Sequence, residues 1–361
     1  MKRLRSMISI GVACAILLLA AACDGSSSIT DSRTPTASTS SGLVDIGDGL
    51  QGPAGLTAST YATGIVNVSA FALDESGGLW VATAAFTDTG DDAVYYVASG
   101  GATPVKMISG LHTALGLLWI DHALYVSSSE SVDSWSGWDG TSFAGGKTNI
   151  VTFPEGTGEV NGMALSPEGR IWLGITSPCD HCEPTDAYSA AVVSFLPDGR
   201  DLKVEASGIR APIGLAYYPG TSDLFVSMDQ RDDLADTTTG DALGIVTSGQ
   251  DWEFPDCYGQ GGSACAGAPT ALAVLDKHSA VSGVAIVTDE LGGKIGTSAL
   301  VAAWASGKVE RVALTKSGDT YTGEVSTFLE GVANPVAVAV SPLGDVFVGD
   351  WSTGTVYKIS G

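Results

Sequence analysis

The sequence predicts an all-β fold, specifically a six-bladed β-propeller. A short apolar strand, a turn rich in Gly, Asp or Pro and a second apolar strand recur along the chain. The copies lie at residues 71–83, 116–128, 162–175, 214–228, 283–304 and 337–350. Repeated strand units of this kind are typical of radial β architectures with one unit per blade. The chain also has 47 glycines and no window of sustained helical periodicity, which argues against a helical protein.

Further strand-like segments lie between the six repeats and supply the outer strands of the blades. They are residues 93–97, 148–153, 190–195, 308–314 and 355–359. Their apolar runs and period-two alternation are typical of buried and half-buried strands. We expect the last of them to pair with an early strand near residues 61–68, because this pairing would close the ring and hide its edges.

The interval between the fourth and fifth repeats is longer than the others. Its surplus residues, 229–268, include Trp252, Phe254, Tyr258 and two cysteines. Long connections in compact folds are usually functional or disordered. The aromatic side chains and the cysteines predict that this one is an ordered loop.

The N-terminal residues predict export. Lys2, Arg3 and Arg5 precede an apolar stretch at residues 7–22 that is too short for a stable membrane span. Small residues then lead to Cys23, as in bacterial lipoproteins, whose mature chains begin at a lipid-carrying cysteine. Several acyl chains hold a protein at a membrane far more firmly than one. The alternative is an ordinary signal peptide that is cut after the alanines before Cys23.

Three regions follow from this interpretation. Residues 1–22 are expected to be a lipoprotein signal peptide, residues 23–41 a disordered Ser/Thr-rich tether, and residues 42–361 the propeller. The tether has almost no apolar residues and therefore cannot bury enough surface to become ordered. The expected location is the bacterial cell envelope, with the protein anchored by lipid to the outer face of a membrane.

The charge of the chain limits its partners. Its 17 Lys and Arg residues against 40 Asp and Glu residues give a net charge of −23. Such an acidic surface disfavours nucleic acids, and we expect no nucleic-acid partner. Solubility outside the cell is sufficient to explain the acidity.

The cysteines of the mature domain predict disulfides. Cys14 lies in the expected signal peptide and Cys23 is assigned to lipid, so four of the six cysteines remain: Cys179, Cys182, Cys257 and Cys265. An even number in an exported chain indicates disulfides, and four cysteines allow three pairings. We favour Cys179–Cys182 and Cys257–Cys265, because each pair lies within one loop.

The sequence CDHC leaves two alternatives open for the first pair. A metal site would use His181 together with its two flanking cysteines, but no independent second Cys/His pair lies nearby. A redox pair would open a helix, whereas this pair follows a predicted strand. Oxidation outside the cell favours the disulfide.

Five stretches in the later part of the chain share a distinctive pattern. They are SPEGRIWLGITSPCDHC, ASGIRAPIGLAYYP, MDQRDDLADTTTGDALGIVTSGQDWEFPDCYG, LDKHSAVSGVAI and ANPVAVAVSPLGDVFVGDWSTGTVYKI. Together they resemble the glucose/sorbosone dehydrogenase family, soluble quinoprotein sugar dehydrogenases that are six-bladed propellers. The likeness covers about the last two-thirds of the chain, and the cysteines, the Asp-rich loop and the order of the stretches agree with it.

The resemblance implies a redox site at one end of the channel. In that family pyrroloquinoline quinone (PQQ) is the cofactor, and Ca²⁺ polarises one of its carbonyl groups. An arginine stabilises the oxygen that gains charge, and a histidine accepts the proton of the sugar hydroxyl. The implied reaction is oxidation of a small sugar by hydride transfer to the quinone, which carries the redox chemistry.

The family's site residues can be placed on this chain. Arg210 stands at the catalytic and PQQ-binding arginine, although a surface arginine is the alternative. Lys308 matches a lysine expected to pair with a quinone carboxylate, although a solvated strand lysine is equally compatible. Asp229 opens the acidic loop and is assigned to the cofactor site. The same loop supplies the expected Ca²⁺ ligands, Asp232, Asp233 and Asp236.

The chain departs from the family most clearly at the catalytic histidine. Near residues 158–160 it has no histidine, and Glu159 is the nearest titratable group. Glu159 and His278 are therefore the candidate proton acceptors, His278 because the family shares its segment. A buried structural histidine is the alternative for His278. Other departures are Ala211 for an asparagine, Ala242 for a glutamate and Asn334 for an arginine.

Three functions are compatible with these residues. The first is a lipid-anchored, PQQ-dependent sugar dehydrogenase. The second is a propeller of the same family that has lost the cofactor and binds a carbohydrate or a protein. The third is a Ca²⁺-dependent, lactonase-like hydrolase, which the acidic loop alone would allow but which fits the cysteine-containing stretches less well. We favour the dehydrogenase on the strength of the resemblance.

Overall fold

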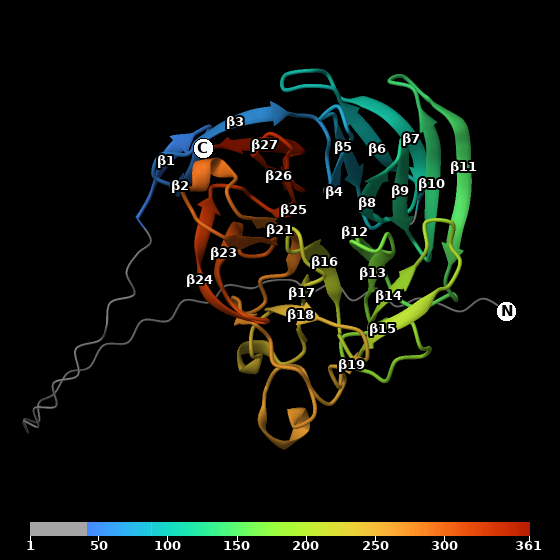
Figure 1. Cartoon of the computed structure of the whole chain (residues 1–361), viewed down its shortest axis with the longest axis vertical. Helices are drawn as coiled ribbons and strands as arrows, with labels where there is room; N and C mark the ends of the chain where they lie inside the picture. Colours follow the sequence, from blue (N-terminus) through green and yellow to red (C-terminus); the bar gives the residue numbers. More distant parts are fainter. Residues whose placement is uncertain (1–41, 88) are drawn as a thin grey trace, which may run out of the picture. The chain divides into compact units, whose positions relative to one another are not determined.

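In the computed structural model of the protein, the described residues form six β-sheets arranged around a central axis, as the sequence predicts (Figure 1). The structure describes residues 42–361 except residue 88. The expected signal peptide, tether and Cys23 lie outside the described residues. Within that part of the chain, no helix is long and apolar enough to cross a membrane.

Each blade is an antiparallel sheet whose first strand faces the axis. The first strands are β4 (Val68–Leu73), β8 (Ala114–Ile120), β12 (Val160–Leu165), β16 (Pro212–Tyr217), β21 (Val281–Val287) and β25 (Pro335–Val340). The second strands are β5 (Leu79–Thr83), β9 (Ala123–Ser128), β13 (Ile171–Ile175), β17 (Leu224–Met228), β22 (Ser298–Ala303) and β26 (Val346–Asp350). These two strands are the halves of the recurring sequence unit.

The outer strands complete the blades. The third strands are β6 (Asp92–Val97), β10 (Ser131–Trp138), β14 (Ala191–Phe195), β18 (Ala242–Val246), β23 (Lys308–Ser317) and β27 (Thr355–Ser360). The fourth strands are β7 (Val105–Leu111), β11 (Phe143–Thr152), β15 (Lys203–Ser207), β20 (Ala273–Val274), β24 (Thr320–Glu330) and β3 (Thr57–Ala62). The segments predicted as outer strands all fall within this set.

The ring is closed by strands from its two ends. β27 pairs antiparallel with β3, with Val356 opposite Ala62 and Ser360 opposite Thr57. The expected closure is therefore present, but its early strand lies a few residues before the predicted 61–68. The reason is that Val68 already begins β4, the first strand of the next blade.

Two blades carry additional strands. β1 (Leu43–Gly47) and β2 (Leu50–Pro53) form a hairpin that pairs with β24 and so covers the outer edge of its blade. β19 (Gln250–Asp251) adds a short parallel strand beside β15. Covered edges offer no free backbone groups to another chain.

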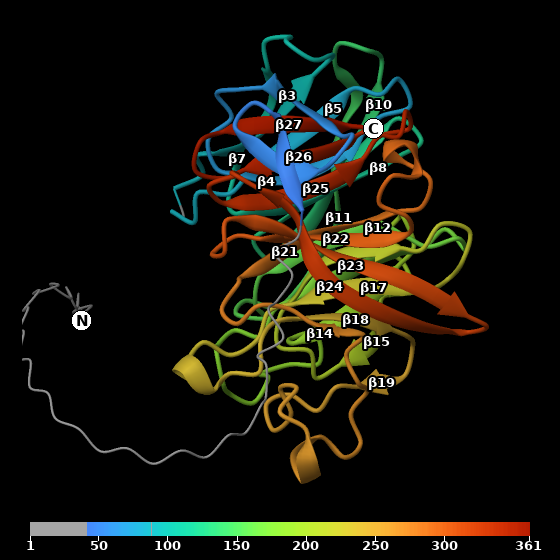
Figure 2. The same cartoon turned by 90° about the vertical axis from the view of Figure 1, so that its left-hand side faces the viewer.

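The interval 229–268 is not a single loop, which corrects the expectation from the sequence. It contains β18, the third strand of its blade, which pairs with β17 along its whole length. This short apolar strand was not predicted from the sequence because Asp-rich residues precede it. The remaining residues form two ordered connections. The first contains the short 3-10 turn η1 (Ala235–Thr237), and the second contains β19 and the 3-10 turn η2 (Gly262–Cys265). The second connection projects from the ring (Figure 2).

The core lies between blades rather than in one central mass. The hydrophobic cluster between the first two blades, for example, joins Trp80 of β5 to Leu124 of β9, and both side chains are fully buried. Equivalent clusters fill the other five interfaces in the described ring. Each blade therefore packs on its two neighbours, as in other repeat architectures. The second strands are mostly apolar, and every residue of β5, β17, β22 and β26 is buried because both faces of these strands are covered.

Glycines allow the inner strands of neighbouring blades to approach closely. Four of the six repeats begin with glycine: Gly116, Gly162, Gly214 and Gly283. A Cβ atom on Gly162 would lie 2.6 Å from the carbonyl oxygen of Ile213 in the next blade, and one on Gly214 would lie 2.5 Å from that of Ser282. The recurring glycine thus marks the place where each blade meets the next at the axis.

Candidate functional site

The centre of the ring encloses a cavity of about 510 Å³. Its size is within the range of small-molecule sites in proteins. The inner strands of all six blades line it, represented by Ala70, Leu115, Gly162, Ile213, Val281 and Val336. The wall is mostly apolar because these strands present small and aliphatic side chains to the axis.

Two carboxylates and two tryptophans of the lining share one end of the cavity. Glu159 and Ala280 come directly before inner strands, whereas Asp229, Trp304 and Trp351 come directly after second strands. Inner and second strands run antiparallel within a blade, so these positions lie at the same end of the ring. The topology therefore places the two carboxylates and both tryptophans at one mouth.

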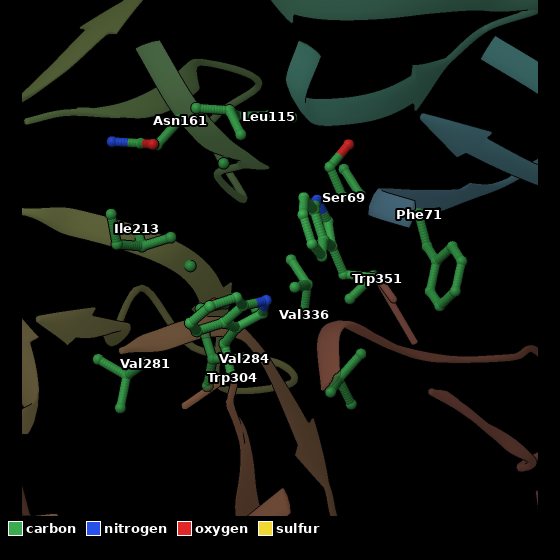
Figure 3. Close-up of a pocket in the computed structure, with 18 of the residues that line it drawn as sticks. Ser69, Phe71, Leu115, Asn161, Ile213, Val281, Val284, Trp304, Val336 and Trp351 are labelled. Carbon is green, nitrogen blue, oxygen red and sulfur yellow. The ribbon is translucent and has the colours of Figure 1, made fainter. Parts of the chain in front are cut away.

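Trp304 and Trp351 form an aromatic pair at this mouth. Their rings meet edge to face with centroids 6.0 Å apart and an interplanar angle of 76°. Figure 3 shows both rings toward the middle of the cavity. The indole Nε1–H of Trp351 donates to the carbonyl oxygen of Ala84 at 2.8 Å, and Asn334 donates through Nδ2 to the carbonyl oxygen of Trp304 at 3.0 Å. These bonds fix the pair against neighbouring loops.

Phe86 adds a third aromatic side chain. It follows β5, lines the cavity and is 55% exposed. Its φ of 56° lies in the left-handed region, which is unusual for a bulky residue and is often associated with functional loops. Phe86 also borders a second compartment of about 500 Å³ that shares Leu115 and Glu159 with the axial cavity.

Glu159 stands between these two compartments. Its backbone carbonyl accepts a hydrogen bond from Asn161 Nδ2 at 3.2 Å, and the same amide group donates to Thr176 Oγ1 at 2.6 Å. Among the described residues, its carboxylate has no hydrogen-bond or ion-pair partner. Surrounding protein raises the pKa of Glu159, and the nearby charge of Arg210 opposes the rise only in part. An unpaired carboxylate therefore faces the cavity.

Asp229 is the second acidic group of the lining. Burial and the nearby carboxylate of Asp241 raise its pKa well above the usual range, while Arg210 acts in the opposite direction. Its Oδ2 lies 3.1 Å from Arg210 Nη1. Asp241 is itself buried and accepts backbone hydrogen bonds from Gln230 and Ser279. Two carboxylates thus share this side of the mouth.

Arg210, the expected catalytic and cofactor-binding arginine, is enclosed by carboxylates. Its Nη2 lies 2.6 Å from Asp180 Oδ1, and its Nη1 contacts Asp229. Asp232 lies further away, at 4.0 Å. The side chain is 12% exposed and borders the second compartment rather than the axial cavity. Its charge is already matched within the protein.

The other expected site residues lie outside the axial cavity. Both ring nitrogens of His278 are engaged: Nδ1 is 3.1 Å from Asp232 Oδ1, and Nε2 is 2.6 Å from the carbonyl oxygen of Ala235. Lys308 is 2.6 Å from Asp276 Oδ2 and 3.5 Å from Glu310 Oε1. Neither side chain borders the axial cavity. The ammonium group of Lys308 is used in local ion pairs, and both ring nitrogens of His278 are used in local polar contacts.

The expected Ca²⁺ ligands are not gathered into one cluster. Asp233 pairs with Arg231 through two short contacts, 2.8 and 2.7 Å, and Asp232 pairs with His278. The third, Asp236, lies in the short turn η1. Within the described part of the chain, no group of three or more His, Cys, Asp or Glu side chains is arranged to hold a metal ion.

The disulfides have the favoured pairing. Cys179 is bonded to Cys182, and Cys257 is bonded to Cys265. The first bond closes the loop that presents Asp180 to Arg210. The second closes the connection between β19 and β20. Both cross-links agree with a protein from an oxidising compartment outside the cytosol.

The aromatic residues of the mouth were not predicted from the sequence. Trp304 follows the second strand of its repeat in VAAW, and Trp351 does the same in VGDW. Their identical position in two repeats was the available signal. An aromatic residue directly after a second strand lies at the end of the channel, whereas one within the strand packs between blades.

Comparisons with known proteins agree with this architecture. No family model matches the sequence. No curated protein matches it either. Among solved structures, the PQQ domain of pyranose dehydrogenase from Coprinopsis cinerea, in its holo form, is 16% identical, with a TM-score of 0.70 over 86% of this chain and 97% of that one. The chain has the fold of the soluble sugar dehydrogenases.

Two bacterial structures extend this finding. The PQQ-bound aldose sugar dehydrogenase from Streptomyces coelicolor is 18% identical, with a TM-score of 0.66 over 86% of this chain and 99% of that one. The soluble aldose sugar dehydrogenase from Escherichia coli, in its apo form, is 16% identical, with a TM-score of 0.67 over 84% and 99%. The sequence resemblance is thus confirmed at the level of the fold.

The axial cavity does not suit PQQ. The quinone carries three carboxylates, and burying unpaired carboxylates is costly. The described lining contains no Lys, Arg or His and contributes two carboxylates of its own. Arg210 is held by Asp180 and Asp229. A tricarboxylate in this cavity would meet like charge instead of counter-charge, so we derive no reaction step through the quinone.

Proposed function

We propose that the protein binds a small sugar in the axial cavity through the aromatic pair Trp304 and Trp351 and the carboxylates at the mouth. The observation that carries this proposal is the composition of the cavity: an apolar wall with an aromatic pair and a few polar groups at one end. Aromatic rings offer flat apolar surfaces to the C–H faces of a sugar. Carboxylates accept hydrogen bonds from its hydroxyl groups.

The fold supports the same ligand class. The structural neighbours named above are sugar dehydrogenases, and they match this chain over more than four-fifths of its length. A propeller of this shape that binds a sugar without the quinone corresponds to the second hypothesis from the sequence. Calorimetric titration of the purified protein with a panel of monosaccharides tests it. The proposal fails if none of them binds to the folded protein.

PQQ-dependent sugar oxidation is the second candidate. The PQQ-bound state of two neighbours favours it, and so does the raised pKa of Glu159, because a carboxylate of raised pKa is a better general base near neutral pH. The poor charge match of the cavity argues against it. Titration with PQQ and Ca²⁺, followed by sugar-dependent reduction of a dye, separates the two functions. Binding of sugar without quinone supports the first candidate.

We also propose that the protein is exported and anchored through lipid on Cys23. The two disulfides support a location outside the cytosol. The basic, apolar and small residues that precede Cys23 support the lipid anchor. The propeller would then act at the cell envelope, where small sugars arrive from outside.

A further inference from the structure

We propose that the ligand of the axial cavity is a sugar bearing an ammonium group, that is, an amino sugar. The inference rests on the proposed sugar-binding function and specifies its ligand class. The charges at the mouth are unequal. Glu159 has no ion-pair partner among the described residues, whereas the nearby Arg210 is already paired with Asp180 and Asp229.

The ion pairs around the mouth leave an excess of negative charge. Arg210 faces two close carboxylates, Asp180 at 2.6 Å and Asp229 at 3.1 Å. Glu159 adds a further carboxylate that has no partner among the described residues. Arg210 therefore contacts Asp180 and Asp229, whereas Glu159 has no ion-pair partner among the described residues. A ligand with a positive charge would restore the balance.

The surroundings of Glu159 and Asp229 strengthen the preference for a positively charged ligand. Glu159 is an exposed residue of the cavity lining, and Asp229 is half-buried. Surrounding protein raises the pKa of both carboxyl groups, because it disfavours the charged form. A neutral ligand would remove water from Glu159 and leave the carboxylate without a counter-charge. An ammonium group would offer it a charge-assisted hydrogen bond, which is about twice as strong as a neutral one.

The aromatic pair favours the same kind of ligand. Cations are attracted to the faces of tryptophan rings, and the attraction is larger where water is excluded. Trp304 and Trp351 lie at the mouth that holds Glu159 and Asp229. The carboxylates and the aromatic pair would thus act on the same ligand from different blades. A bare metal ion fits less well, because the described side chains do not form a cluster of three metal ligands.

The test is a calorimetric titration of the purified mature protein with four ligands at neutral pH. Glucosamine carries the ammonium group, and N-acetylglucosamine has the same ring with a neutral amide. Glucose tests the neutral sugar, and choline tests the cation without the sugar. We expect glucosamine to bind at least about tenfold more tightly than each of the other three, the contribution expected of a charge-assisted contact supported by a cation–π contact.

A matched pair of variants tests the assigned carboxylate. We expect Glu159→Gln to reduce the preference for glucosamine over glucose to about one, since the substitution removes the charge but keeps the shape. Glu155→Gln changes an exposed glutamate four positions earlier, outside the axial cavity, and should keep the preference. A melting temperature of Glu159→Gln that is no lower than that of Glu155→Gln excludes a folding defect.

The outcomes separate this inference from the function on which it rests. Equal binding of glucosamine and glucose overturns the inference and leaves sugar binding in place. Choline that binds as tightly as glucosamine overturns it as well, because the sugar ring would then contribute nothing. If no sugar binds, the proposed function fails together with the inference. A preference for glucosamine that survives Glu159→Gln refutes the role of that carboxylate.

Discussion

Asp180 and Arg210 form an ion pair of 2.6 Å that joins the disulfide-closed loop before β14 to the loop before β16. Asp180 also accepts backbone hydrogen bonds from Asp232 at 3.0 Å and Asp233 at 2.8 Å. A single carboxylate thus connects three loops beside the mouth of the cavity. The arginine implied by the family resemblance serves here as a structural link.

This arrangement predicts that Arg210 contributes to stability. Replacing it with methionine should lower the free energy of unfolding by about 3 kcal/mol, because partly buried carboxylates would lose their counter-charge. Denaturant unfolding measures the loss. Arg200→Met is the control, since Arg200 pairs with Asp198 at a highly exposed site, and its replacement should cost less than about 1 kcal/mol. Equal losses would contradict the structural role.

The aromatic pair predicts a loss of ligand affinity. Trp304→Ala should weaken sugar binding about tenfold, because it removes the apolar face on which we expect the sugar to stack. The loss should appear in the calorimetric dissociation constant and not in the melting temperature. Trp135→Ala, on the outer strand β10, is the control and should leave the affinity unchanged. Unaltered binding by Trp304→Ala would place the ligand elsewhere.

The raised pKa values predict greater stability at mildly acidic pH. Surrounding protein raises the pKa of the exposed Glu159, of Asp229 and of the fully buried Glu310. A carboxyl group with a higher pKa in the folded chain binds its proton more tightly when folded. Its contribution to the free energy of unfolding therefore falls as the pH rises through the interval between its unfolded and folded pKa values. The melting temperature should be higher near about pH 5 than near about pH 8.

Carboxyl groups whose pKa is lowered in the folded protein lose their stabilising contribution only at more acidic pH, so they do not cancel the predicted rise in melting temperature. Asp139, whose pKa of about 2 is set by hydrogen bonds from Thr141 and Ser142, loses its contribution only as the pH falls below its unfolded value of 3.8. Glu159→Gln should reduce the difference in melting temperature between the two pH values. A protein that is less stable at the lower of these pH values would refute the prediction.

The recurring glycine predicts a steep cost for a small side chain. Gly214→Ala would place a Cβ atom 2.5 Å from the carbonyl oxygen of Ser282 and 2.7 Å from the backbone nitrogen of Val284. Both neighbours are backbone atoms, so two blades must separate. We expect a loss of about 2 kcal/mol or more in unfolding free energy. Gly220→Ala is the control, because no atom lies within 4 Å of the Cβ atom that it would add. Its positive φ adds some strain, but no neighbouring blade has to move.

The proposed lipid anchor predicts a change of cell fraction. Cys23→Ser should move the exported protein from the membrane fraction to the soluble fraction, because the acyl chains hold it at the membrane. Detergent phase partitioning followed by mass spectrometry of the N-terminal peptide detects the change. A soluble wild-type protein that begins at Cys23 without acyl mass would instead support cleavage by an ordinary signal peptidase.

The sequence predicted the ring because its repeats are local. Each inner strand, turn and second strand fits within one short segment, and the glycine at the start of four repeats marks the contact between blades. The pairing of Cys179 with Cys182 is equally local. In contrast, β18 was hidden within an acidic interval, because a five-residue apolar strand resembles a loop segment when its neighbours are aspartates.

The candidate site was harder to predict because its chemistry depends on distant partners. Arg210 meets a carboxylate that is 30 positions earlier and another that is 19 positions later. Sequence likeness identifies the arginine but not the two side chains that neutralise it. Trp304 and Trp351 come from two neighbouring blades and meet only when these blades pack together. Local patterns therefore gave the scaffold, whereas the charge of the cavity required the three-dimensional arrangement.

The pairing of β3 with β27 has a consequence for biogenesis. The last blade takes three of its strands from the end of the chain and its fourth from near the beginning, so an emerging polypeptide remains an open arc until its final residues are available. Before that moment one lateral sheet edge is free to pair with another molecule. Loss of the last few residues would therefore expose the unfinished ring to aggregation, even though most of the blades would be intact.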